Sequence, residues 1–270
     1  MENFLLAQEN IIRLGVFFGM FIIMAMWEVF YEKRPQILKR RQRWPHNILL
    51  TVVDTALVRV IFPVFPIGLA LIADAEGWGV FNIITLPPML EVLSAVILLD
   101  LAIYGQHVVF HKVPILWRLH RVHHADTEID ITTGARFHPI EIALSLLIKM
   151  AIIAAVGIPA TAVILFEVIL NGAAMFNHAN VRLPNVADRL LRWVIVTPDM
   201  HRVHHSEIVE ETNSNYGFNL SCWDRIFGTY RHAPRFGHLG MTIGLPIFRG
   251  QEEARLDKLL TQPFRNEPTH

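Results

Sequence analysis

"HRVHH" occupies residues 120–124 and recurs unchanged at residues 201–205. Residues three and four positions apart lie on one face of a helix. If both copies are helical, each presents two or three imidazole rings in one direction. Two identical clusters of this kind predict that both copies contribute to one shared site.

Further histidines surround these two copies. Ten of the 14 histidines lie between residues 107 and 205, and His107 and His111 in "HVVFH" have the same helical spacing. A single buried histidine is more often a hydrogen-bonded core residue than a ligand, but ten unpaired imidazoles in one interior would be costly. Neutral imidazole is the commonest metal ligand, and ten are too many for one ion. The clusters therefore predict a site for two metal ions with these candidate ligands: His107, His111, His120, His123, His124, His138, His178, His201, His204 and His205.

The remaining residue types narrow the kind of metal site. Cys222 is the only cysteine, which excludes a cysteine-rich zinc site. The HExxH motif of zinc proteases does not occur. Glu-x-x-His occurs only at Glu267–His270, with Pro268 between them, so the carboxylate-bridged di-iron site of soluble bundles is not available. A pair of metals with nearly all-histidine ligands remains, and imidazole suits iron, copper, zinc and nickel.

Carboxylates near the histidines are candidates to orient them. Asp100, Tyr104, His107 and His111 form one helical stripe, so Asp100 is predicted to accept the spare N–H of a ligating ring. The alternative is that Asp100 caps or pairs elsewhere. Weaker candidates of the same kind are Asp126, Glu141 and Asp199. The histidines outside the clusters, His46, His232, His238 and His270, are expected to be ordinary surface residues.

The composition favours a membrane protein. Hydrophobic residues make up 53% of the chain and charged residues 18%, and the mean hydropathy is +0.37. Four apolar regions are long enough to suggest membrane helices: residues 11–31, 48–72, 90–110 and 142–176. We predict an all-α integral membrane bundle of about three spanning helices and an apolar helical hairpin, with a cytosolic histidine-rich helical cap. The alternative is a soluble bundle of buried helices. The net charge of zero gives no support for nucleic-acid binding.

The fourth apolar region is predicted to be the hairpin. "GIPA" at residues 157–160 interrupts it near its middle, and glycine closely followed by proline favours a turn. Lys149 and Glu167 would then lie at equal depth in antiparallel helices. We predict that they pair, because an isolated charge in the membrane is costly. The alternative is that Lys149 extends to the surface.

The loop charges predict the orientation. The segment "KRPQILKRRQR" at residues 33–43 contains six lysines and arginines, whereas residues 73–88 contain none. The positive-inside rule places residues 33–43 in the cytoplasm. The histidine site, which follows the third apolar region, is then expected on the cytoplasmic side.

Three units are expected along the chain. Residues 1–90 would hold the membrane anchor helices, residues 91–232 the two-metal domain, and residues 233–270 a cytosolic tail. Within the second unit, "NYGFNLSCWDRIFGTYR" at residues 215–231 is interpreted as a packing cap, because Trp223 and Phe227 have helical spacing. The alternative is a lid over the active site.

With these motifs in order, the chain resembles the fatty acid hydroxylase/sterol desaturase superfamily. HxxxH, HxxHH and a later HxxHH flank an apolar hairpin, and "RFHPIE", "FNHAN", "TPDMHRVHH" and residues 215–231 resemble family segments. The resemblance covers roughly residues 92–231. It implies a membrane di-iron oxygenase that uses O2 and external electrons to hydroxylate or desaturate a fatty acyl chain, sterol or ether lipid.

The resemblance also implies the metal ligands and partners. Eight histidines of the three motifs are the implied ligands, and His138 and His178 fit further family positions. Two iron ions are the expected cofactor, with zinc as a possible substitute in purified protein. The three intervening residues of the first motif lower the expectation of the sphingolipid hydroxylase branch. The chain shows no cytochrome b5-like or ferredoxin-like segment, so a separate electron-donor protein (cytochrome b5-, ferredoxin- or reductase-like) is expected beside the membrane lipid substrate.

Two other functions use the same residues. A metal transporter or metal store would also place histidines within a membrane protein, but it needs ligands distributed across the membrane depth. A di-zinc lipid hydrolase would tolerate these ligands, but it needs an acidic general base near an open metal position.

Overall fold

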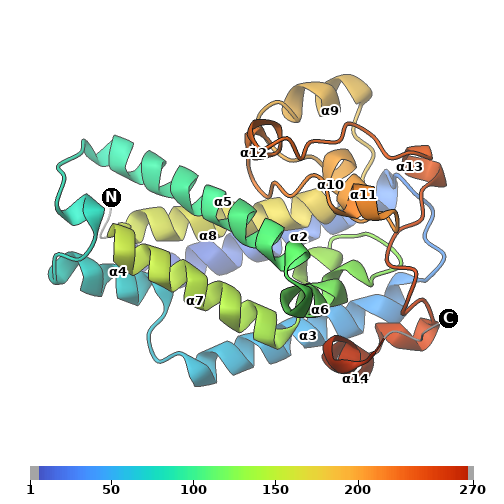
Figure 1. Ribbon diagram of the computed structural model, residues 1–270, viewed down its shortest axis with the longest axis horizontal. Coiled ribbons are helices and arrows are strands. Elements are labelled where there is room, and N and C mark those ends of the chain that lie inside the picture. Colours follow the sequence, from blue (N-terminus) through green and yellow to red (C-terminus); the bar gives the residue numbers. More distant parts are fainter. Residues whose placement is uncertain (1–5, 267–270) are drawn as a thin grey trace.

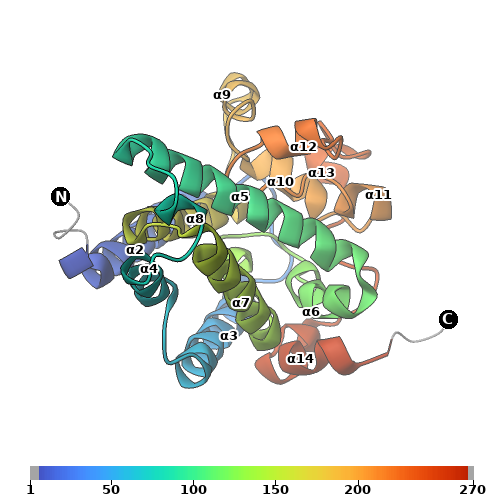
Figure 2. The ribbon, with the colours of Figure 1, turned by 60° about the vertical axis from the view of Figure 1, so that its left-hand side comes forward.

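The computed structural model describes residues 6–266. Within this range the protein is all-helical, with three isolated β-bridges and no β-strand. The long helices are α2 (Glu9–Phe30), α3 (Arg40–Ile61), α5 (Pro88–Lys112), α7 (Pro139–Val156) and α8 (Ala160–His178), joined by the shorter α4 (Pro66–Ala75). They run along the long axis of the molecule and form its bundle (Figures 1 and 2).

The shorter helices gather at one end of this bundle and form the cap (Figure 1). These are α6 (Pro114–His124), α9 (Asn185–Leu191), α10 (Pro198–His204), α11 (Val209–Thr212), α12 (Cys222–Ile226), α13 (Gly237–Gly240) and α14 (Leu256–Thr261). Single 3-10 turns occur at Val80–Asn82, Thr133–Ala135, Gln251–Ala254 and Gln262–Phe264.

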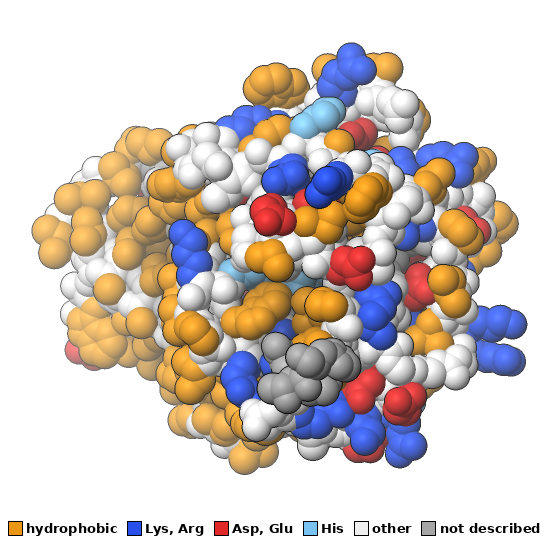
Figure 3. Space-filling model, turned by 45° about the vertical axis from the view of Figure 1, so that its right-hand side comes forward, with side chains coloured by type: hydrophobic (Ala, Val, Ile, Leu, Met, Phe, Trp, Pro, Cys, Tyr) orange, Lys and Arg blue, Asp and Glu red, His pale blue; other side chains and the backbone are white. Residues whose placement is uncertain are grey.

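The bundle has the dimensions of a membrane domain. Five helical stretches are long and apolar enough to cross a bilayer: Glu9–Phe30, Arg40–Asn82, Pro88–Lys112, Pro139–Val156 and Ala160–His178. Hydrophobic side chains cover the bundle end of the molecule, whereas charged ones gather over the cap (Figure 3). The predicted architecture of apolar spans, hairpin and histidine-rich cap is confirmed. The second apolar region differs in detail, because Pro63 and Pro66 end α3 and begin α4 instead of continuing one helix.

A core of small and branched residues joins α5 to the hairpin. Leu99 of α5 packs with Ile153 of α7 and with Val163 and Phe166 of α8, all nearly fully buried. The hairpin turns where predicted, since α7 ends at Val156 and the next residue, Gly157, has a φ of 75°, a conformation that favours glycine. Because this packing holds α5, α7 and α8 together, it also sets the positions of the histidines at their cap ends.

The predicted ion pair within the hairpin is confirmed. Lys149 Nζ lies 2.7 Å from Glu167 Oε1, and Arg13 of α2 adds a second cation 2.9 Å from Glu167 Oε2. The second partner was not expected from the sequence, because nothing local indicates that α2 packs beside α8. Together the two cations compensate a carboxylate that would otherwise be costly in the membrane.

The basic segment 33–43 has a structural role besides its charge. Arg43 of α3 is fully buried and donates to both carboxylate oxygens of Asp126, at 2.8 and 2.6 Å, and to Asp130 Oδ2 at 2.6 Å. Lys33 Nζ bonds to Asp199 at 2.8 Å. These pairs attach residues 33–43 to both histidine segments.

The C-terminal segment packs against the cap. Arg118 donates to the carbonyls of Pro263 and Arg265, and Arg121 donates to those of Gln262 and Arg265. Leu259 of α14 forms a small apolar cluster with Leu50 of α3 and Val122 of α6. Residues 256–265 therefore cover the outer side of α6.

Candidate metal centre

Nine of the ten candidate histidines converge at the junction of bundle and cap. His107, His111, His120, His124 and His204 form one group, and His123, His178, His201 and His205 form a second. Within each group, one nitrogen of every ring lies within 4.8 Å of the corresponding nitrogens of the others. We refer to these as the first and second histidine groups.

Local helix geometry explains how the repeated motif serves both groups. All three histidines of the first copy lie at the end of α6, and the rings of His120 and His123 are 5.3 Å apart, but the Nε2 of His123 reaches the Nε2 of His178 on α8 at 3.1 Å. His123 therefore joins the second group. α10 is short and begins where Thr197 Oγ1 accepts from the Met200 amide at 3.3 Å. It places His204 in the first group and leaves His205, just beyond its end, in the second.

The outward nitrogens of five rings are bound to oxygen atoms. The Nδ1–H groups donate as follows: His107 to Tyr216 O at 2.8 Å, His111 to Asn213 Oδ1 at 3.3 Å, His120 to Glu141 Oε1 at 2.6 Å, His178 to Ala174 O at 2.7 Å and His204 to Ser214 O at 2.8 Å. A proton held at Nδ1 leaves the lone pair of Nε2 directed inward. This is the tautomer that a metal-binding histidine needs.

The spacing of the inward nitrogens fits ligation of a shared metal ion better than hydrogen bonding between the rings. The Nε2 atoms of His107 and His120 lie 3.2 Å apart, those of His123 and His178 3.1 Å, and those of His178 and His201 2.9 Å. Two nitrogens bound at right angles to one ion at about 2.1 Å would be about 3 Å apart. Within residues 6–266, buried nitrogens without a hydrogen-bond partner include Nε2 of His111, His124 and His204 and both nitrogens of His205. These residues therefore fit a metal in each group.

The two groups adjoin one another. The rings of His124 and His205, one from each group, stack with centroids 4.6 Å apart, and the rings of His120 and His123, also one from each group, lie 5.3 Å apart. Phe137 covers one side, stacked 4.4 Å from His123. The arrangement can hold two adjacent ions, with Phe137 covering one side of them.

The buried rings outside the spanning helices are held neutral. Burial lowers the pKa of His120 to about 3. Burial and the neighbouring imidazoles lower the pKa of His123, His124, His201, His204 and His205 well below 6.5. At neutral pH these rings therefore carry free lone pairs for ligation.

Of the four carboxylates predicted to orient a histidine, only one bonds to a ring of the two groups. Asp100 does not hold a histidine, so that expectation is wrong. It accepts instead from the backbone amides of Asn219 and Leu220, at 3.3 and 3.1 Å, and from Trp223 Nε1 at 2.8 Å. Glu141, one of the weaker candidates, is the carboxylate that holds His120.

Asp126 and Asp199, the other weaker candidates, pair with cations. Asp126 binds Arg43, and Asp199 binds Lys33 and Arg202. Both lie next to histidine motifs in the sequence, yet their bonds hold the segments and not the rings.

His138 lies apart from both groups. Its Nδ1 accepts from the Ile140 amide at 3.2 Å and so caps α7, and its Nε2 lies 3.2 Å from the carbonyl of Leu260. A ligand role for His138 stays a prediction, and its contacts favour the capping role. His46 and His232 lie outside the groups, His238 lies 3.8 Å from Asp199, and His270 is outside the described residues.

Residues 213–216 support the first histidine group and were not predicted from the sequence. Asn213, Ser214 and Tyr216 each bind one ring of the first group, and Asn215 has a φ of 51°. Asp224 anchors this turn by accepting from the amides of Tyr216 and Gly217, both at 2.8 Å. The polar run "NSNYG" was the available signal. Phe227 stacks on Tyr104 at 5.3 Å, so residues 215–231 pack against the bundle, as the cap interpretation proposed.

The part of the chain that holds the two histidine groups is similar to known proteins. Residues 92–229 match the fatty acid hydroxylase family. The chain is 28% identical over 149 residues to the ornithine lipid hydroxylase of Rhizobium tropici, covering 55% of the chain and 44% of that protein. It is 29% identical over 158 residues to the alkylglycerol monooxygenase of Homo sapiens, covering 57% of the chain and 34% of that protein.

A third relative is the cholesterol 25-hydroxylase of Rattus norvegicus, 27% identical over 147 residues, covering 53% of the chain and 48% of that protein. The chain thus spans less than half the length of each of these three relatives. No solved structure matches the chain.

Proposed function

The chain belongs to the fatty acid hydroxylase family, and from this premise we propose that it is a membrane-bound oxygenase that hydroxylates or desaturates a C–H bond of a lipid. The relatives named above are hydroxylases and a monooxygenase of lipids. The proposed reaction uses O2 and electrons from a separate donor protein. Its substrate class is a fatty acyl chain, a sterol or an ether lipid.

One observation carries the proposal: nine imidazoles form two adjoining groups at one end of an apolar bundle. We propose that each group holds one iron ion. Bound iron would supply the activation of dioxygen that an unreactive C–H bond requires. A transport path would need ligands along the membrane depth, whereas these lie together at the cap.

The other residues of the site would act by positioning. Glu141, Tyr216 and Ser214 hold ring protons on the outer nitrogens, which keeps the inner lone pairs directed at the ions. Phe137 and Trp117 flank the rings, and apolar walls of this kind exclude water from the reacting centre. The site therefore needs little rearrangement to bind metal.

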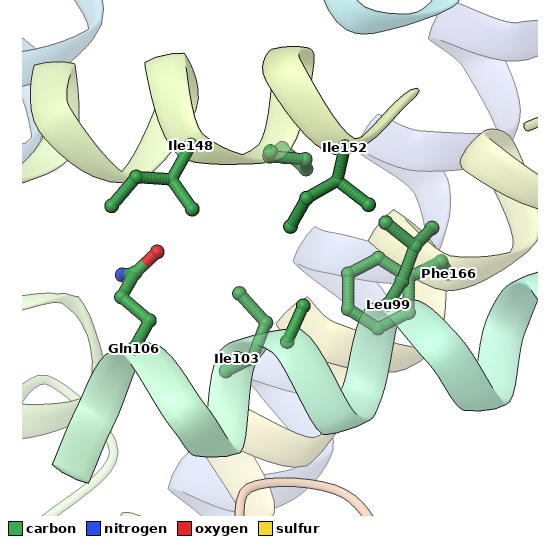
Figure 4. Close-up of a pocket in the computed structure, with 8 residues that line it drawn as sticks. Leu99, Ile103, Gln106, Ile148, Ile152 and Phe166 are labelled. Atoms are coloured by element: carbon green, nitrogen blue, oxygen red, sulfur yellow. The ribbon is translucent and has the colours of Figure 1, made fainter. Parts of the chain in front are cut away.

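We propose that the lipid chain reaches the centre through the cleft between α5 and α7 (Figure 4). Leu99, Ile103, Ile148, Ile152 and Phe166 line this cleft, and Gln106 lies at one end of it. The cleft encloses about 10 Å³, so a chain enters only when α5 and α7 separate. Gln106 directly precedes the ligand candidate His107 on α5, so its end of the cleft is the one nearer to the first histidine group.

Gln106 offers a polar contact at this end. Its Nε2 donates to Ser145 Oγ at 2.7 Å, and its buried Oε1 has no hydrogen-bond partner within residues 6–266. A hydroxyl or amide N–H of the lipid would satisfy that oxygen. The proposal thus predicts a preference for lipids with such a donor near the oxidised carbon.

The reaction is tested by lipid analysis of cells that express the native chain or His123→Ala. We expect one lipid class to gain one oxygen, or to lose two hydrogens, only with the native chain. His232→Ala, a histidine outside both groups, is the control and should behave as the native chain does. Identical lipid profiles for native and His123→Ala proteins, both present in the membrane, would reject the oxygenase.

The metal is tested on anaerobically purified protein by elemental analysis and Mössbauer spectroscopy. About two iron ions per chain are expected from the two groups. Zinc as the ion that supports activity would instead favour the hydrolase.

The cleft is tested by filling it. Ile148→Trp should abolish lipid oxidation and leave the metal content unchanged, because Ile148 faces the cleft and not the histidines. Leu147→Trp is the matched control, since the neighbouring side chain is 51% exposed on the outside of the bundle. Full activity of Ile148→Trp would reject the cleft while leaving the oxygenase proposal intact.

We propose a cytoplasmic location for the histidine site. The basic segment 33–43 contacts the cap directly, through Arg43 to Asp126 and Lys33 to Asp199. The positive-inside rule places that segment in the cytoplasm. The histidine site, which is bonded to that segment, would then lie on the same side of the membrane. Labelling of a cysteine introduced at Arg41, which is exposed, from one side of sealed vesicles would test this.

A further inference from the structure

The cap helix α12 is attached to the middle of α5, twelve residues before α5 ends at Lys112. Asp100 accepts hydrogen bonds from Trp223 Nε1 on α12 and from the amides of Asn219 and Leu220 just before it. Asp100 is twelve residues from Pro88, where α5 begins, which corresponds to at most about 18 Å of depth. The hydrocarbon layer of a bilayer is about 30 Å thick. If α5 enters the membrane near its first residue, α12 lies inside the leaflet nearer the cap.

A second contact gives the same depth. Phe227, directly after α12, stacks on Tyr104 of α5 with ring centroids 5.3 Å apart. Tyr104 is one helical turn beyond Asp100 and about 24 Å from the start of α5. At this depth, the side chains of α12 that point away from α5 would face lipid.

The exposed side chains of this region suit such surroundings. Six of them are apolar and between 56% and 67% exposed: Val186, Leu190, Trp193, Val194, Ile226 and Phe227. We call these residues the α9–α12 patch. The Arg225 guanidinium lies 4.9 Å from the Trp193 ring, which joins the two parts of the patch. Figures 1 and 2 show α9 projecting from the side of the molecule.

Cations border the patch. Arg182 precedes α9, Arg189 lies on it, and both are exposed. In Figure 3 hydrophobic and basic side chains occur together at the top of the molecule, where α9 lies. Tryptophan, arginine and aliphatic residues in this combination are typical of segments that lie in the membrane interface.

We propose that the α9–α12 patch is embedded in the leaflet nearer the cap, with its apolar side chains among acyl chains and Arg182 and Arg189 at lipid phosphates. The contacts to Asp100 and Tyr104 set the depth, and Phe227 of the patch lies directly against α5. A consequence is that Asp100 has its hydrogen bonds completed inside the membrane by the docked segment. The inference rests on the membrane fold and does not depend on the oxygenase reaction.

The test uses the fact that Cys222 is the only cysteine. In a Cys222→Ser background, Leu190→Cys is labelled with an environment-sensitive fluorophore, and the protein is reconstituted into phosphatidylcholine–phosphatidylglycerol vesicles. Lipids with a nitroxide on the acyl chain should quench this label at least about two-fold more than a label at Leu239→Cys. Leu239 on α13 is the matched control, since it is 67% exposed and Leu190 is 65% exposed. Leu93→Cys on α5 serves as the embedded reference.

Equal quenching at Leu190 and Leu239 would overturn the proposal, as would label–label contact showing that a second copy covers the patch. A second measurement avoids replacing the cysteine. Brominated lipids quench the tryptophan fluorescence of the native chain, and Trp193→Phe should remove part of the quenchable signal. An unchanged quenched fraction in Trp193→Phe would also count against the embedded patch.

Discussion

At the scale of single residues, Glu141 is the side chain that orients the ring of His120. It is buried, and its Oε1 accepts the Nδ1 proton of His120 at 2.6 Å. Its role follows from position, because Pro139 begins α7 with Glu141 facing α6. The carboxylate keeps His120 in the tautomer that binds metal through Nε2.

We therefore expect Glu141→Ala to weaken metal binding by about 10- to 100-fold. Glu141→Gln should lose less, because the amide oxygen still accepts the proton. Metal titration followed by elemental analysis measures the effect, with exposed Glu210→Ala as the control. Native affinity in Glu141→Ala would show that His120 needs no such partner.

Gly134 shows how tightly the second group is enclosed. A Cβ at this position would lie 2.7 Å from Ala174 O and 3.1 Å from His178 Nδ1, the two atoms that bond to each other. Gly134→Ala should displace His178 and lower the metal content from two ions toward one per chain. Gly172→Ala on α8 is the control, because its added Cβ would meet no described atom within 4 Å apart from its chain neighbours and the nearby backbone of α8. Two tightly bound ions in Gly134→Ala would contradict this prediction.

At the scale of elements, the α7–α8 hairpin depends on a carboxylate shared by two cations. Glu167 lies between Lys149 and Arg13, at 2.7 and 2.9 Å. The cations belong to α7 and α2, so the bonds of Glu167 hold three helices together. Replacing Glu167 and replacing one of its two cations should therefore lower the stability by different amounts.

Glu167→Ala removes the carboxylate from Lys149 and leaves Arg13 with Glu9, 3.8 Å away, so it should lower the free energy of unfolding by about 3–5 kcal/mol. Lys149→Met should cost less, because Arg13 still neutralises the carboxylate. Unfolding in mixed micelles with increasing denaturing detergent measures both. If Lys149→Met is the more damaging change, Arg13 does not compensate Glu167.

At the scale of the whole molecule, the metal ions would join parts of the chain that are distant in sequence. The ligand candidates come from α5, α6, α8 and α10, together with His205 just beyond α10. Only the folded chain brings them together. Metal binding should therefore stabilise the entire cap against the bundle.

Anaerobic addition of Fe²⁺ to metal-free protein should raise the melting temperature, by an amount equivalent to about 2.7 kcal/mol at a free concentration of 100 times Kd. A chelator should reverse the shift, and His123→Ala should reduce it. His232→Ala, outside both groups, should retain the full shift. A melting temperature that is independent of metal in the native chain would indicate that the two groups bind none.

The features predicted correctly from the sequence are those with a local periodic signal. The apolar spans, the turn at Gly157, the Lys149–Glu167 pair and the helical histidine motifs depend on spacing along one or two adjacent helices. Hydrophobic periodicity and helix geometry act over a few turns. These features can therefore be recognised in the sequence without knowledge of the fold.

The tertiary structure alone decided which partners meet. Glu141, and not Asp100, is paired with a histidine, and His138 is separated from the two groups. Arg43, which the sequence shows only as a charge near the membrane, is buried and bonded to Asp126. In each case the partner is far along the chain, and its identity depends on how α3, α5 and α7 pack. Residue types and spacing determined that this protein collects imidazoles in a membrane bundle. Long-range packing determined which rings share a group and which oxygens hold them, because hydrogen bonds form only between atoms that the fold brings within reach.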